Sequence, residues 1–139
     1  MDKYIGTKLI EAEPADRVYG DKAEMGYRVR YADGYESWSP KDAFEEAYRP
    51  TDCMNFGLAI EAMKKGKKVA RRGWNGKGMF LFLGTDIDLH TEADLSCVSN
   101  LEGDLTLPSI VMKTADDRFC VGWLASQTDM LADDWEIVG

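Results

Sequence analysis

An uninterrupted apolar run, Met79–Leu83, constrains the fold of this 139-residue chain more than any other feature. A strand that is apolar on both faces is typical of the centre of a sheet, so the run predicts a central strand. Lys68–Arg71 is predicted to be another strand, and the glycine-rich segment Gly73–Gly78 lies between the two. The middle of the chain is therefore expected to form a sheet around residues 79–83.

A helix is expected just before this sheet. The apolar residues of segment 56–63 recur at i, i+3, i+4 and i+7, which places them on one helical face: Phe56, Ala59, Ile60 and Met63. Asn55 is the predicted N-cap, and Gly66 is the predicted C-terminal stop.

Two further elements complete the predicted sheet. Ile110–Lys113 and Arg118–Gly122 are expected to form a hairpin, and Trp135–Val138 is expected to be an edge strand. Residues 84–107 lack clear periodicity and are interpreted as a long excursion. The predicted fold class is α+β, with a small antiparallel sheet and one main helix in a core domain at 53–139.

The segment before the last strand is expected to contain a short helical turn. Thr128 is the predicted cap of this turn, and Met130 is predicted to pack in the core. Trp135 is also interpreted as a core residue.

The first 52 residues are predicted to form a small β-rich accessory module. Strands are expected at Tyr4–Ala12, Gly26–Tyr31 and Tyr35–Trp38, because the Asp33-Gly34 pair between the last two is a strong hairpin signal. Trp38 is interpreted as a core residue.

A short helix is expected after these strands. Ser39 is its predicted N-cap, Pro40 its first residue, and Tyr48 its end, because Pro50 disfavours helix at the residue before it.

Charge is distributed unevenly along the chain. Its net charge of −8 divides into −4 over residues 1–53, +6 over 54–83 and −10 over 84–139. Seven of the 17 basic residues lie between Lys64 and Lys77, with no acid among them. A short basic stretch in an acidic chain argues against binding of duplex nucleic acid, but it admits a small anion in a local pocket. Part of the cluster is equally explained by lysines at the C-terminal end of a helix.

Catalytic and metal-binding patterns are sparse. His90 is the one histidine, and Cys53, Cys97 and Cys120 form no Cys-x-x-Cys pair. Met79 occupies the position where a phosphate-binding loop of the Walker type requires lysine. No catalytic residue, metal site or cofactor is predicted. The chain has no apolar stretch of about 20 residues, the length that spans a bilayer, so a cytoplasmic protein is expected.

Two tryptophans are candidates for ligand recognition. Trp74 lies on the glycine-rich loop, where a ring is more readily presented than buried, although packing across the sheet edge is the alternative. Trp123 precedes a segment rich in short polar side chains, 124–130. Those side chains either cap a helical turn or contact sugar hydroxyls and base edges.

Two blocks, Lys67–Phe80 and Trp123–Trp135, closely resemble the second Thoeris anti-defence family of phages and prophages. The resemblance covers residues 54–138. It implies a sponge that sequesters cyclic ADP-ribose isomers, the alarm signals made by host TIR enzymes, without cleaving them. Some relatives also bind cyclic dinucleotides. The resemblance further implies a homo-oligomer, a dimer of dimers with ligand pockets between protomers, in the cytoplasm of the bacterial host.

The same resemblance implies candidate ligand contacts. Trp74 and Trp123 are stacking candidates. The remaining candidates contribute polar contacts: Arg72, Asn75, Gly76, Ser126, Gln127, Thr128 and Asp129.

Two other functions remain open at this level. Residues 84–139, with their net charge of −10, are compatible with an acidic inhibitor that binds a host defence protein. The other alternative is a nucleotide-degrading enzyme, which would require an acid/base pair or a metal.

Overall fold

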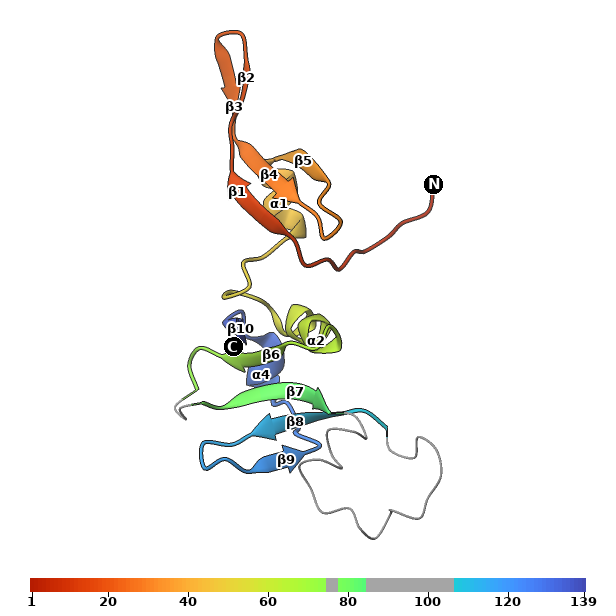
Figure 1. Ribbon diagram of the computed structural model, residues 1–139, viewed down its shortest axis with the longest axis vertical. Helices are drawn as coiled ribbons and strands as arrows, with labels where there is room; N and C mark the ends of the chain where they lie inside the picture. Colours follow the sequence, from red (N-terminus) through yellow and green to blue (C-terminus); the bar gives the residue numbers. More distant parts are fainter. Residues whose placement is uncertain (75–77, 85–106) are drawn as a thin grey trace. The chain divides into compact units, whose positions relative to one another are not determined.

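The computed structural model describes residues 1–74, 78–84 and 107–139, and it divides the chain into two compact units (Figure 1). The N-terminal unit is Met1–Pro50 and the C-terminal unit is Thr51–Gly139. Helices and antiparallel sheets occur together, so the predicted α+β class is confirmed. Within the described ranges, no helix is long and apolar enough to cross a membrane. The predicted excursion lies almost wholly outside the described residues.

The N-terminal unit contains a three-stranded antiparallel sheet of order β1-β4-β5, a separate hairpin and a helix. The elements are β1 Glu11–Pro14, β2 Arg17–Tyr19, β3 Lys22–Glu24, β4 Gly26–Arg30, β5 Glu36–Pro40 and α1 Lys41–Ala47. The predicted turn joins β4 to β5, with Gly34 at a φ of 88° and the Tyr35 amide donating to Asp33 Oδ1 at 3.0 Å. The helix ends before Tyr48 as predicted.

Two predictions for this unit are wrong, and one of its elements was not predicted. The first strand is Glu11–Pro14 rather than Tyr4–Ala12, because the residues that pair with β4 are those that follow Ile10. The β2–β3 hairpin was missed, although Gly20 at its turn has a φ of 60°. Ser39 does not cap α1. It belongs to β5 opposite Tyr27, so sheet pairing holds it in the strand and the helix begins after Pro40 without a side-chain cap.

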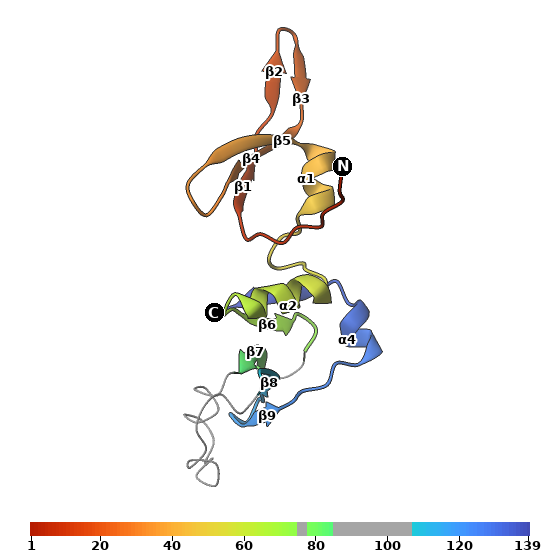
Figure 2. The ribbon, with the colours of Figure 1, turned by 90° about the vertical axis from the view of Figure 1, so that its right-hand side faces the viewer.

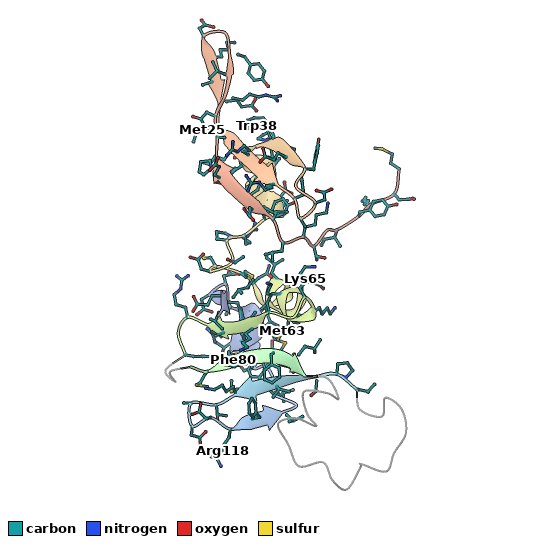
Figure 3. The ribbon with its side chains drawn as sticks, viewed as in Figure 1. Met25, Trp38, Met63, Lys65, Phe80 and Arg118 are labelled. Carbon is teal, nitrogen blue, oxygen red and sulfur yellow. The ribbon has the colours of Figure 1, made fainter. Side chains whose placement is uncertain are left out.

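Trp38 is half-buried rather than a core residue. Its indole N–H donates to the Ala15 carbonyl at 2.6 Å, and its ring packs so closely on Gly26 that a Cβ there would collide with it. Arg17, the first residue of β2, has its guanidinium carbon 4.9 Å from a Trp38 ring centroid, and Figure 3 shows Trp38 near the base of the β2–β3 hairpin. The buried apolar residue of this sheet is Val29, which is 1% exposed.

The C-terminal unit contains a five-stranded antiparallel sheet of order β10-β6-β7-β8-β9. Its strands are β6 Lys68–Arg71, β7 Phe80–Gly84, β8 Ser109–Lys113, β9 Phe119–Val121 and β10 Trp135–Val138, and its helices are α2 Phe56–Lys64 and α4 Gln127–Leu131. The strand built on the apolar run is central, and β10 lies at an edge, as predicted. The predicted β8–β9 hairpin is also confirmed.

Helix α2 packs across β10, β6 and β7 (Figure 2). The Asn55 side chain accepts a hydrogen bond from the Leu58 amide at 2.8 Å, and Gly66 ends the helix at a φ of 83°, so both predicted boundaries are confirmed. Ala59 and Met63 are buried at 0% and 2% exposure. They contribute to one core cluster with the alternate strand residues Val69, Leu81 and Trp135.

The cap of α4 differs from the prediction. Ser126, not Thr128, is the N-cap: its hydroxyl accepts from the Asp129 amide, and the Asp129 carboxylate accepts from the Ser126 amide. This reciprocal capping box satisfies two amides at once, which a cap at Thr128 would not do. Met130 is 40% exposed, so the prediction that it packs in the core is wrong.

Candidate functional site

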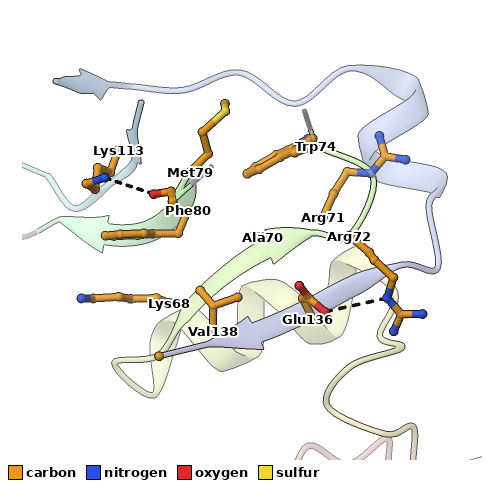
Figure 4. A pocket seen from close by; sticks show the side chains of 12 residues that line it. Lys68, Ala70, Arg71, Arg72, Trp74, Met79, Phe80, Lys113, Glu136 and Val138 are labelled. Carbon is orange, nitrogen blue, oxygen red and sulfur yellow. Dashed lines mark hydrogen bonds and ion pairs between the residues drawn. The ribbon is translucent and has the colours of Figure 1, made fainter. Parts of the chain in front are cut away.

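A cavity of about 450 Å³ lies on the face of the C-terminal sheet opposite α2 (Figure 4). Side chains alternate between the two faces of a strand, and Val69 pairs with Leu81 beneath the helix. Their neighbours Lys68, Ala70 and Phe80 therefore point to the other face. The strands contribute Lys68, Ala70, Phe80, Lys113, Glu136 and Val138 to the lining, and the segment after β6 contributes Arg72, Trp74, Gly78 and Met79.

Basic side chains predominate over acidic ones around this cavity. Of the residues that the structure describes, the lining contains four basic side chains, Lys68, Arg71, Arg72 and Lys113, and one side-chain carboxylate, Glu136. Arg72 lies 3.8 Å from Glu136 and also donates to the Asp52 carbonyl. A partly enclosed site with this charge attracts small anions, because charges there are screened less than charges on the open surface.

Arg71 connects the cavity wall to α4. Its guanidinium donates to Asp129 Oδ1 and to Asp134 Oδ1, both at 3.0 Å, and its side chain is 19% exposed. These two hydrogen bonds raise the pKa of Arg71, and the bond to Asp134 has the larger effect. The pKa of Asp129 is lowered overall. Burial by itself would raise this pKa, but hydrogen bonds from Ser126 and Arg71 outweigh the effect of burial. Both blocks singled out in the sequence are thus held together by one ionic network.

Trp74 belongs to a cluster of three indoles. Its ring centroid lies 5.5 Å from that of Trp135 and 6.1 Å from that of Trp123, in edge-to-face arrangements at 79° and 65°. The expectation that Trp74 stands away from the core is therefore wrong, because the ring is half-buried against other aromatics. The same residue lines the cavity, so this packing fixes its position at the cavity wall.

The structure separates the predicted site residues into groups. Arg72 and Trp74 line the cavity. Trp123 packs behind Trp74 and is not a lining residue, while Ser126 and Asp129 bond to each other at the start of α4. The exposed residues Gln127 and Thr128 lie in the first turn of α4. Asn75 and Gly76 lie outside the described residues.

Sequence reasoning missed most of the lining, including Lys68, Phe80, Lys113 and Glu136. The predicted strand Lys68–Arg71 was a usable signal for Lys68, because successive side chains of a strand point to opposite faces and Lys68 therefore points away from the face of the buried Val69. Lys113 and Glu136 lie on strands that are far in sequence from Arg72 and Trp74, and no local sequence pattern identifies them as lining residues. Across the described ranges, no group of three or more histidine, cysteine, aspartate or glutamate residues is placed to hold a metal ion.

Comparison with known proteins assigns this unit to a family. The Thoeris anti-defense 2-like domain matches residues 54–138. The chain belongs to this family, as the two sequence blocks predicted. One relative is the Thoeris anti-defense 2 protein of Bacillus phage SP01, which is 42% identical over 85 residues. That alignment covers 61% of this chain and 94% of the relative, and the family match leaves out the whole N-terminal unit.

Proposed function

We propose that this protein is a phage anti-Thoeris sponge that binds a cyclic ADP-ribose isomer and withholds it from its host receptor without cleaving it. Family membership supports the coarser statement, an anti-Thoeris function. The observation that favours a small anionic ligand is the basic and aromatic cavity bordered by Arg72 and Trp74, two residues of the matched block.

The chemistry of the cavity suits the parts of such a ligand. Its volume of about 450 Å³ is within the usual range for small-molecule sites. An indole supports a base, cations attract phosphate, and the Glu136 carboxylate is able to accept hydrogen bonds from ribose hydroxyls. Stacking is worth about 1–3 kcal/mol per base, and with charge-assisted phosphate contacts the total can approach the roughly −12 kcal/mol of nanomolar binding.

The lining also favours binding over turnover. Glu136 is its one side-chain carboxylate among the described residues, so the described lining offers no pair of carboxyl side chains to act as general acid and general base. We therefore propose a protein that is not an enzyme and releases its ligand intact.

We further propose that the working form is a homo-oligomer, a dimer of dimers in the cytoplasm of the infected host, with the ligand held where protomers meet. A cavity open on one side is compatible with completion by a second copy. The N-terminal unit is proposed to be an accessory module outside ligand capture, since the family match begins after it.

Isothermal titration calorimetry against a panel of cyclic ADP-ribose isomers and cyclic dinucleotides tests the proposal. We expect nanomolar binding of at least one cyclic ADP-ribose isomer, and mass spectrometry of heat-released ligand should return its unchanged mass. Binding of cyclic dinucleotides alone would redirect the proposal to that ligand class. Hydrolysed product in stoichiometric excess over protein would identify an enzyme instead. Failure to bind any nucleotide, together with stable capture of a purified Thoeris protein, would identify a protein-binding inhibitor.

A further inference from the structure

We infer that Lys68 and Lys113 form a subsite for the diphosphate of the ligand, one ammonium group for each phosphoryl group. For the identity of the complete ligand this inference rests on the proposed function. For the subsite itself it rests on the arrangement of the two lysines around Phe80 in the cavity.

The two lysines flank one aromatic ring from neighbouring strands. Phe80 lies on the central strand β7 and pairs directly with Lys113 of β8, while Lys68 lies on the other neighbour, β6. Lys113 Nζ is 5.6 Å from the ring centroid and Lys68 Nζ is 4.7 Å from it. Figure 4 shows the ring between the two side chains. Cation–π attraction holds the ammonium groups at the ring without consuming their capacity to donate hydrogen bonds.

The ring also sets the class of anion. Because Phe80 separates the two ammonium groups, a single phosphate group is placed to contact one of them at a time. A diphosphate carries two linked anionic groups, so each can meet one ammonium at the edge of the ring. The arrangement therefore favours a diphosphate over an isolated monophosphate.

The arginines of the cavity are less available for this role. Arg71 is committed to Asp129 and Asp134, with 19% of its side chain exposed. Arg72 is bonded to the Asp52 carbonyl and lies near Glu136. Among the residues that the structure describes, Lys68 makes no ion pair.

Lys113 has two partners, and their strength decides whether it can bind a ligand. It donates to the Gly78 carbonyl at 3.2 Å and pairs with Asp117 at 2.8 Å. The Asp117 side chain is 82% exposed, and an ion pair so open to water contributes little. A phosphoryl group inside the cavity can therefore replace Asp117 as the partner of the ammonium.

The test is calorimetry on the full-length protein with two probes, the cyclic ADP-ribose isomer bound by the wild type and inorganic diphosphate. Lys68→Gln and Lys113→Gln should each lower the affinity for both probes by about tenfold, the scale of one charge-assisted hydrogen bond. The double variant should lower both affinities further. Lys64→Gln is the matched control, because Lys64 pairs with Glu61 on α2 and does not line the cavity. It should leave both affinities unchanged.

Asp117→Asn separates a binding role of Lys113 from a structural one. If Lys113 acts only by securing the β8–β9 turn through its ion pair with Asp117, Asp117→Asn should weaken binding as much as Lys113→Gln does. If it holds phosphate, Asp117→Asn should leave binding unchanged or tighten it, because competition for the ammonium is removed. Thermal unfolding of every variant checks that the protein remains folded.

The outcomes distinguish the subsite from the proposed function. Diphosphate binding that is lost in the lysine variants, with no cyclic nucleotide bound, would retain the subsite and reject the sponge. Cyclic nucleotide binding that survives in folded Lys68→Gln and Lys113→Gln would retain the sponge and overturn the subsite. Binding of neither probe by the wild type would overturn both.

Discussion

The two faces of the C-terminal sheet use the same strands for different purposes. Beneath α2, Val69, Leu81 and Trp135 are all 0% exposed and belong to one core cluster. On the opposite face, the neighbouring residues Lys68, Phe80 and Glu136 border a cavity. Because successive side chains point to opposite faces, one residue separates a position that stabilises the fold from one available to a ligand. Substitutions at adjacent positions should therefore have separable effects.

The largest effect is expected from Leu81→Ala, which truncates a fully buried side chain under α2. We expect a loss of about 2–5 kcal/mol in the free energy of unfolding. The variant loses the free energy gained by burying the removed methyl groups, and the cavity left behind costs further stability. Urea denaturation measures it. The fraction that remains folded should bind ligand with unchanged affinity; a large affinity loss in that fraction would show that the two faces are coupled.

Arg71→Met should come next, because it removes both carboxylate contacts from one partly buried guanidinium. The expected loss of stability is about 2–3 kcal/mol, since hydrogen bonds to charged groups are among the stronger ones. Denaturant unfolding gives the value. The variant should also weaken ligand binding, because the segment with Asp134 and α4 loses its attachment to β6.

The pKa of Asp129 gives this network a pH dependence. Its folded-state pKa lies below the ordinary 3.8, so its contribution to stability is complete above that value and is lost as pH falls through the lower, folded-state pKa. Acid unfolding of Asp129→Asn should lack this component, and an unchanged acid profile would contradict the assignment.

Trp74→Ala should weaken ligand binding by about 1–3 kcal/mol through loss of stacking. Its contacts with Trp135 and Trp123 mean that thermal stability should also fall, though less than for Leu81→Ala. Trp74→Phe is the matched control, since it keeps an aromatic ring. If Trp74→Ala unfolds at lower temperature while its folded fraction binds normally, the indole is purely structural.

The smallest effect is expected from removal of residues 1–50. A chain that begins at Thr51 retains the entire C-terminal unit, which contains every residue of the family match, 54–138. Its affinity should change by less than tenfold in calorimetry. A larger loss from a folded and still oligomeric truncated protein would show that the N-terminal unit contributes to ligand capture.

Local patterns in the sequence predicted the elements of the C-terminal unit well. Helix α2 and central strand β7 have periodicities that short-range physics determines, so their existence and boundaries could be inferred. The cap of α4 was misassigned because Ser126 and Thr128 are chemically similar, and only the reciprocal bond with Asp129 distinguishes them. In the N-terminal unit, the strand start at Glu11 depends on which residues meet β4, a pairing that local composition does not encode.

The candidate site was predictable only in part. Arg72 and Trp74 were recognised through a contiguous block of sequence. Lys113 and Glu136 join them through the β7–β8 and β6–β10 pairings, which bring together residues more than 30 positions apart. Such convergence is a property of strand order, and no window of the sequence contains it.

The segment just before α2 has a consequence for where this domain can be cut. Met54 exchanges two backbone hydrogen bonds with Trp135, at 2.8 and 3.1 Å, and the Ile137 amide donates to the Thr51 carbonyl at 2.8 Å. Residues 51–54 thus shield the outer edge of β10, whose backbone groups would otherwise be open to pairing with another chain. A protein trimmed to the start of α2 would keep every helix and strand of the domain, but β10 would become an exposed edge strand with unpaired backbone groups. Such a cut also removes the buried Met54 and the Asn55 cap of α2, so we expect aggregation together with a loss of stability.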